Sequence, residues 1–153
     1  MLEEYEINED TQAILPIDST KSVVYEQDAE YIVNQPSNKI INYNCNFYGS
    51  SYLGRCEGTK KLTGIKTKYP IIIEESRQII FFPTSSTRNQ QTQWISLNNI
   101  KSIEKKSDHS IIIFDNDKKI NFDISYYSLN NQYIRANLLQ SKLYERIIKK
   151  QSK

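Results

Sequence analysis

Hydrophobic residues occur in short runs from residue 13 to about residue 124, and Asp, Asn, Pro and Gly separate these runs. Short apolar or alternating runs bounded by turn-forming residues are typical of β-strands. The strands expected on this basis are residues 13–17, 22–27, 31–34, 40–48, 70–73, 78–82, 93–97, 100–105, 110–114 and 118–124. The last two flank Asp115-Asn116-Asp117, so they predict a hairpin.

The hydrophobic period changes in the last segment, from Ser128 to about Lys150. Apolar residues there recur at intervals of three, four or seven residues, which predicts an amphipathic helix with one buried face. These residues are Leu129, Tyr133, Ala136, Leu143 and Ile147, with Leu139 beside them. Ser128 is a suitable N-cap for this helix.

All four glycines lie between Gly49 and Gly64. Glycine is favoured where the backbone takes a positive φ or where a close approach leaves no room for a Cβ atom. A short helix from Ser51 to about Leu62, with Ser50 as its N-cap, is expected in this window. The backbone N–H groups at its start would suit a phosphate.

Together these patterns predict an α+β protein, with a mainly antiparallel sheet, a long C-terminal helix and a short glycine-rich helical insert. A pleckstrin-homology-like barrel, plugged at one end by the last helix, is the more specific expectation. Residues 1–153 have the length of one domain.

Charge divides the chain into an acidic part, residues 1–38, and a basic body, residues 39–153. The first part holds nine acidic residues against Lys21 alone, a net charge of −8, and the second carries a net charge of +10. Basic bodies bind polyanions by neutralising phosphates and releasing counterions, whereas lysine-rich surfaces also serve solubility. The acidic part is expected to act as an arm that folds over the basic face.

Several function classes find little support in the sequence. The apolar stretches are too short to span a bilayer and the N-terminus is acidic, so a cytoplasmic protein without membrane contact is expected. Cys45, Cys56 and the single His109 do not supply a four-ligand zinc site, and we expect no metal, no cofactor and buried, reduced cysteines. Glu74 and Glu75 point to opposite faces of a strand, which argues against an acid and base pair. We therefore expect no enzyme.

The spacing of Gly49 and Gly54 matches the phosphate-binding loop G-x-x-x-x-G-K-[ST], but the chemistry does not. Arg55 stands in place of the lysine that reaches the terminal phosphates, and Cys56 in place of the hydroxyl that binds magnesium. A nucleotide hydrolase is therefore disfavoured.

The window Cys45-x-Phe47-Tyr48-Gly49-Ser50-Ser51-Tyr52-x-Gly54-Arg55-x-x-Gly58-Thr59 resembles the signature of the competence transcription factor (ComK) family of Gram-positive bacteria. The resemblance extends from about residue 38 to residue 148. It continues through Lys68-Tyr69-Pro70-Ile71, Phe82-Pro83-Thr84, Trp94-Ile95 and Ile124-Ser125-Tyr126-x-Ser128-x-x-x-Gln132-Tyr133.

This resemblance implies a transcription activator of DNA-uptake genes. Members of the family bind AT-rich boxes in double-stranded DNA as oligomers, mainly through the minor groove. The chain ends at Lys153, whereas family members commonly continue into a tail linked to adaptor-mediated degradation. A proteolytic adaptor is therefore left open as a further partner. Tyr69 also replaces the first proline of the family's paired motif, which predicts a less rigid backbone before Pro70.

The residues expected to contact DNA are selected by their charge and by their position in the chain. Arg55 in the glycine window and Arg88 in a polar loop suit a narrow, strongly negative minor groove. Lysines and hydroxyls nearby suit phosphate and sugar. The full expected set is Ser50, Ser51, Arg55, Lys60, Lys61, Lys66, Lys68, Ser85, Ser86, Thr87 and Arg88. A surface ion pair for Arg55 and an ordinary solvated loop at residues 84–91 are the alternatives, and Trp94 is expected in the core.

Two function classes remain open. The first is a DNA-binding transcription regulator. The second, based on the barrel expectation, is a pleckstrin-homology-like module that binds a protein or a lipid headgroup. Binding through several phosphates weakens steeply as salt rises, so salt dependence separates the two.

Overall fold

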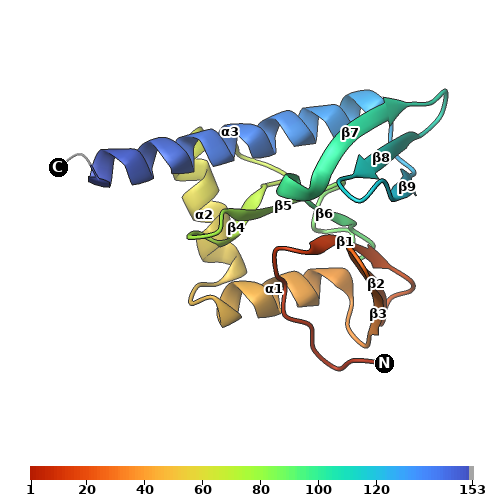
Figure 1. Cartoon of the computed structure of the whole chain (residues 1–153). Helices are drawn as coiled ribbons and strands as arrows, with labels where there is room; N and C mark the ends of the chain where they lie inside the picture. The colour runs from red at the N-terminus through yellow and green to blue at the C-terminus, as the bar shows by residue number, and fades with distance from the viewer. Residues whose placement is uncertain (152–153) are drawn as a thin grey trace.

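The computed structural model describes residues 1–151. They form three layers, and the middle layer is an antiparallel sheet (Figure 1). This sheet has the strand order β3-β2-β1-β6-β5-β4. Its strands are β1 (Thr11–Pro16), β2 (Ser22–Glu26), β3 (Glu30–Val33), β4 (Ile71–Glu74), β5 (Ile79–Pro83) and β6 (Trp94–Ser96). The first three strands and the last three therefore meet where β1 pairs with β6.

A smaller antiparallel sheet and the long last helix cover one face of the central sheet. The small sheet consists of β7 (Ile100–Lys105), β8 (Ser110–Phe114) and β9 (Lys119–Phe122), and the short 3-10 helix η1 (Leu97–Asn99) leads into it. The predicted hairpin of β8 and β9 is confirmed, with Asp117 in the left-handed region at φ 67°. The helix is α3 (Tyr126–Gln151).

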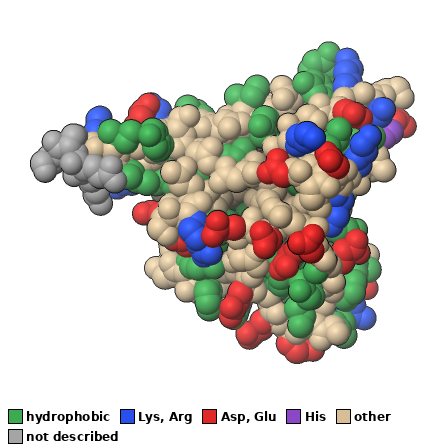
Figure 2. Space-filling view, viewed as in Figure 1, with side chains coloured by type: hydrophobic (Ala, Val, Ile, Leu, Met, Phe, Trp, Pro, Cys, Tyr) green, Lys and Arg blue, Asp and Glu red, His purple; other side chains and the backbone are tan. Residues whose placement is uncertain are grey.

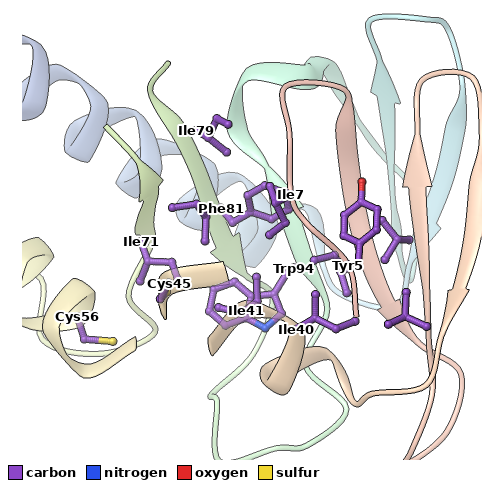
Figure 3. Packing of buried hydrophobic residues seen from close by; sticks show 14 residues of the cluster. Tyr5, Ile7, Ile40, Ile41, Cys45, Cys56, Ile71, Ile79, Phe81 and Trp94 are labelled. Carbon is purple, nitrogen blue, oxygen red and sulfur yellow. The ribbon is translucent and has the colours of Figure 1, made fainter. Parts of the chain in front are cut away.

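The opposite face of the central sheet is covered by α1 (Ser37–Phe47) and α2 (Tyr52–Thr63). Side chains alternate along a strand, so β5 sends Phe81 to this face and Phe82 to the other. In the same way β6 sends Trp94 to the α1 side and Ile95 to the α3 side. Figure 3 shows Trp94 beside Ile41 of α1, and Trp94 is fully buried, which confirms it as a core residue.

The predicted α+β class, the antiparallel sheet, the glycine-linked helix and the long C-terminal helix are confirmed. The barrel is not formed among the described residues. Closure would require β3 and β4 to pair, but these strands are the two opposite edges of the central sheet. The two separate sheets instead sandwich side chains such as Phe82 and Phe114 against α3.

Residues 40–48, predicted as a strand, belong largely to α1, so that prediction is wrong. Ile40, Ile41, Asn44 and Cys45 are buried, and their spacing places them on one face of a helix. Isoleucine, asparagine and cysteine have low intrinsic helix propensity, and packing against the sheet outweighs it here.

The acidic part of the chain is not an independent arm, because β1 lies in the interior of the central sheet. The segment before β1 is also fixed to α1. The buried Asn44 side chain accepts a hydrogen bond from the Ile7 N–H at 2.7 Å and donates to the Tyr5 carbonyl at 2.9 Å. Residues 1–38 are therefore an integral part of the folded structure.

Glycine-window geometry explains the ends of the two short helices. Gly49, at φ 87°, follows α1, and Gly64, at φ 79°, is the left-handed C-cap of α2. The N-cap of α2 is Ser51 and not Ser50, because the Ser51 hydroxyl accepts from the Gly54 N–H at 2.9 Å. At the start of α3, Ser125 takes the role predicted for Ser128, since its hydroxyl accepts from the Ser128 N–H.

Candidate nucleic-acid interface

Two loops that are distant in the sequence form a groove with a volume of about 540 Å³. One loop, residues 64–70, joins α2 to β4, and the other, residues 84–93, joins β5 to β6. The basic groove, as we call it, is lined by Tyr52, Lys66, Thr67, Lys68, Tyr69, Ser86, Thr87 and Arg88. It brings together five of the residues that the sequence predicts at DNA, from two separate segments of the chain.

The first wall of the groove is fixed to α3. Lys68 is held in the left-handed region, at φ 47°, and its carbonyl oxygen accepts a hydrogen bond from Gln132 Nε2 at 3.1 Å. One turn further along α3, Arg135 donates to the carbonyl of Thr67. The backbone between the two lysines is therefore anchored while their side chains reach solvent.

The second wall is fixed to α1 and to itself. Asn38 of α1 donates from Nδ2 to the Thr87 carbonyl at 3.0 Å. The buried Thr92 hydroxyl donates to the Asn89 carbonyl at 2.6 Å, and the Thr92 carbonyl accepts from the Ser37 hydroxyl. This loop is thus an ordered structure and not an unconstrained turn.

The electrostatics of the groove are one-sided. Lys66, Lys68 and Arg88 are exposed, and within residues 1–149 none of them lies within 4.0 Å of an acidic group. Among residues 1–149, no acidic residue lines the groove. Three uncompensated cations on an anchored surface attract a polyanion, because phosphates replace the missing countercharge.

Arg55 lies outside the basic groove. Its side chain is 16% exposed and is directed at the end of β4. Nη2 donates to the Ile73 carbonyl of β4 at 3.5 Å, and Nη1 lies 3.6 Å from Oε1 of Glu75, which follows the strand. Its Nε is buried and has no hydrogen-bond partner among the described atoms. This geometry corresponds to the ion-pair alternative, and a DNA contact by Arg55 stays a prediction.

The other predicted contacts are dispersed. Ser50 is half-buried and follows α1, Ser51 caps α2, and the Ser85 hydroxyl lies 3.2 Å from that of Thr92. Lys60 and Lys61 are exposed in the last turn of α2. Lys61 also lines a separate hollow between α2 and α3, so the structure does not gather these residues around one site.

Sequence reasoning missed three lining residues, Tyr52, Thr67 and Tyr69. Tyr52 packs edge-to-face on Trp94, with ring centroids 6.2 Å apart, and it also lines the groove. Thr67 and Tyr69 alternate with the two lysines in the sequence, and this interleaving was the available signal. A hollow of about 170 Å³ adjoins the groove through Tyr52 and Thr87, and Asn42 adds an amide to it.

The remaining candidate chemistry is not assembled into a site. Cys45 and Cys56 are free and buried, and burial raises the pKa of the Cys45 thiol to about 12. His109 lies beside the exposed Asp108, with 2.7 Å between Nδ1 and Oδ1. Through residue 149, no three His, Cys, Asp or Glu side chains are grouped to hold a metal ion. None of the described helices combines the length and apolar character that crossing a bilayer requires.

Acidic side chains lie on a different part of the surface. Figure 2 shows most of those visible in this view below α3, on the half of the molecule that holds the N-terminal segment, α1 and β1–β3. The acidic part of the sequence thus becomes an acidic side of the molecule. Repulsion from that side would disfavour contact of a polyanion there.

Comparison with known proteins adds independent information. The family model described as ComK protein matches residues 2–148. The competence transcription factor of Bacillus subtilis (strain 168) is 37% identical over 150 residues, which are 95% of this chain and 78% of that protein. No solved structure matches the chain.

Proposed function

The chain belongs to the ComK family, and from this premise we propose that it regulates competence genes by binding double-stranded DNA through the basic groove. The observation that carries the proposal is the meeting of Lys66, Lys68 and Arg88 on two anchored loops. The name of the Bacillus subtilis relative supports a role in competence regulation, and the position of the three cations supports the basic groove as the DNA-binding surface.

AT-rich recognition through the minor groove is the finer part of the proposal. A narrow A-tract minor groove carries an enhanced negative potential that attracts an inserted arginine. Arg88 lies at an exposed loop position in the basic groove and meets this requirement better than Arg55. The two lysines would then neutralise phosphates, and Ser86 and Thr87 would contact phosphate or sugar.

Fluorescence anisotropy with AT-rich and GC-rich duplexes of equal length, across a salt series, tests this proposal. We expect tighter binding to the AT-rich duplex and a steep decline with salt. Lys66→Ala should weaken binding to both duplexes and reduce the salt slope by about one. Lys119→Ala, an exposed lysine on β9, is the matched control and should leave both unchanged.

Absence of DNA binding at low salt would overturn the proposal. The lipid-headgroup alternative is tested in parallel with vesicles that contain anionic lipid. Vesicle binding without duplex binding would assign the groove to a headgroup phosphate. The proteolytic adaptor suggested by the family resemblance stays a prediction, and nothing in the groove bears on it.

A further inference from the structure

From Ile134 onwards, α3 has two apolar faces. One is buried and includes Ala136, Leu139 and Leu143. The other lies opposite and consists of Ile134, Leu138, Tyr144 and Ile148, whose side chains are between 40% and 56% exposed. Figure 2 shows hydrophobic side chains exposed along α3. A soluble helix ordinarily places polar residues on its outer face, so this second face requires an explanation.

The spacing of the outer face is symmetric about one residue. Ile134, Leu138, Ser141, Tyr144 and Ile148 follow one another at intervals of four, three, three and four residues. The mean interval is 3.5 residues, the repeat that keeps a seam of side chains facing a second helix. The sequence of intervals reads the same in both directions, and the small, exposed Ser141 occupies its centre.

We propose that this face binds the same face of a second copy of the chain, with the two α3 helices antiparallel and Ser141 on the two-fold axis. An isologous contact requires a patch that is complementary to itself. In this register Ile134 meets Ile148 of the second copy, and Leu138 meets its Tyr144. Both members of each pair are apolar, and the serine leaves room for the helices to approach at the axis.

Charges on the flanks favour the antiparallel arrangement. Lys142 and Glu145 form an ion pair on one helix, with 3.7 Å between Nζ and Oε2. At the antiparallel register they lie level with Gln140 and Asn137 of the second copy, so like charges are not opposed. A parallel pair would place Lys142 and Arg146 of each helix beside the same residues of the other, which costs free energy.

Space around α3 is compatible with this contact. In Figure 1 the C-terminal end of α3 extends beyond α2, away from both sheets. The paired segment of 15 residues is about 21 Å long. Such a helix pair buries less than the roughly 800 Å² per partner of a standard interface, so we expect a dimer that dissociates on dilution.

Tyr127, although 71% exposed, is not part of the proposed contact. Its hydroxyl accepts from Lys105 Nζ at 3.1 Å, and the same ammonium lies 4.7 Å from the ring centroid. Tyr127 therefore has a hydrogen-bond and cation–π partner within the chain, and the proposed contact is limited to residues 134–148.

The contact has a consequence that rests on the proposed function. Gln132 and Arg135, at the near end of the paired segment, hold the backbone of Lys68 and Thr67. Pairing through α3 would therefore fix two basic grooves in a two-fold relationship. A symmetric pair of grooves suits two half-sites in inverted orientation on one duplex.

The first test is sedimentation equilibrium of the full chain over a range of concentrations. We expect a reversible monomer–dimer equilibrium, and Leu138→Glu should shift it to monomer by at least tenfold in dissociation constant. Leu53→Glu, which makes the same change at a 73% exposed leucine of α2, should leave the equilibrium unchanged. A wild-type chain that stays monomeric at all concentrations would overturn the proposal, whatever its DNA binding.

The register is tested by cross-linking with a short bis-maleimide. Ser141→Cys should cross-link to itself, because the axis brings the two copies of this position together. Ile134→Cys and Ile148→Cys should each react poorly alone and efficiently when mixed. Wild type is the control, since Cys45 and Cys56 are buried. Efficient self-reaction of Ile134→Cys would indicate a parallel pair and contradict the antiparallel register.

Discussion

Gln132 Nε2 lies 3.1 Å from the carbonyl oxygen of Lys68. The same amide nitrogen lies 2.8 Å from the carbonyl oxygen of Pro83, where the second loop of the basic groove begins. Gln132 is 3% exposed, so one buried side chain of α3 joins both walls of the groove. This arrangement gives a physical reason for a buried glutamine at position 132.

Replacing Gln132 should therefore affect stability and DNA binding together. In Gln132→Leu, the Lys68 and Pro83 carbonyls lose their donor, and an unpaired buried polar group costs about 1–3 kcal/mol. We expect a loss of about 2 kcal/mol in the free energy of unfolding, measured in urea, and weaker binding to DNA at temperatures where the variant is folded.

Gln140→Leu is the matched control for this experiment. Gln140 is on the same helix and donates to Asn98 Oδ1 at 2.7 Å, but this bond lies at the surface. Both the stability and the DNA affinity of Gln140→Leu should remain near wild type. Equal effects of the two substitutions would contradict a specific role for Gln132.

The roles of Arg88 and Arg55 can be distinguished by comparing how each substitution affects binding to AT-rich and to mixed-sequence DNA. We expect Arg88→Ala to weaken binding to AT-rich duplexes more than to mixed sequence, because its side chain is free to enter the minor groove. Arg55→Ala should chiefly lower stability, since it removes the contacts with Glu75 and the Ile73 carbonyl. Fluorescence anisotropy with both duplexes checks this prediction. A selective loss of AT preference in Arg55→Ala would indicate that Arg55, and not Arg88, enters the DNA minor groove.

Part of the basic groove was predictable from the sequence, and part was not. Charge and loop composition identified Lys66, Lys68 and Arg88 individually. Their proximity depends on β4 and β5 pairing as neighbours and on Gln132 drawing the two loops together. No local pattern encodes that pairing, and for the same reason the inward orientation of Arg55 could not be read from its place in the glycine window.

The fold shows the same division between local and long-range information. The strands and the hairpin follow from short apolar or alternating runs bounded by turn-forming residues, and α3 follows from its helical spacing of apolar residues. The helix α1 was missed because its isoleucines and asparagines favour other conformations locally. Asn44 helps to stabilise α1 in its place on the sheet, because its side chain forms hydrogen bonds with the backbone of the N-terminal segment.

Asn44 should accordingly be a stability determinant. Its side chain is fully buried and makes three hydrogen bonds, to Ile7, Tyr5 and Ile40. Asn44→Ala leaves the Ile7 N–H and the Tyr5 carbonyl without this partner, and at about 1–3 kcal/mol per buried group we expect a loss of ~3 kcal/mol. Urea unfolding checks the value, and Asn46→Ala, at an exposed position of the same helix, should change stability by less than about 0.5 kcal/mol.

The lowered pKa of Glu74 predicts that the protein loses stability in acid. Burial raises the pKa of this carboxyl, but hydrogen bonds from the Ser76 hydroxyl and from the backbone and side chain of Arg77 outweigh burial and lower the pKa to about 2. In the unfolded chain the pKa is near 4.5. Because the folded pKa is the lower one, ionised Glu74 stabilises the fold fully above pH 4.5, and this contribution is lost as the pH falls to about 2.

Unfolding in urea at several pH values between 7 and 2 should show this window. We expect the difference in free energy of unfolding between wild type and Glu74→Gln to be constant above pH 4.5 and to shrink steadily towards pH 2. Glu57→Gln, at an exposed position of α2, should differ little from wild type throughout. A difference for Glu74→Gln that persists unchanged at pH 2 would mean that the carboxylate charge does not stabilise the turn after β4.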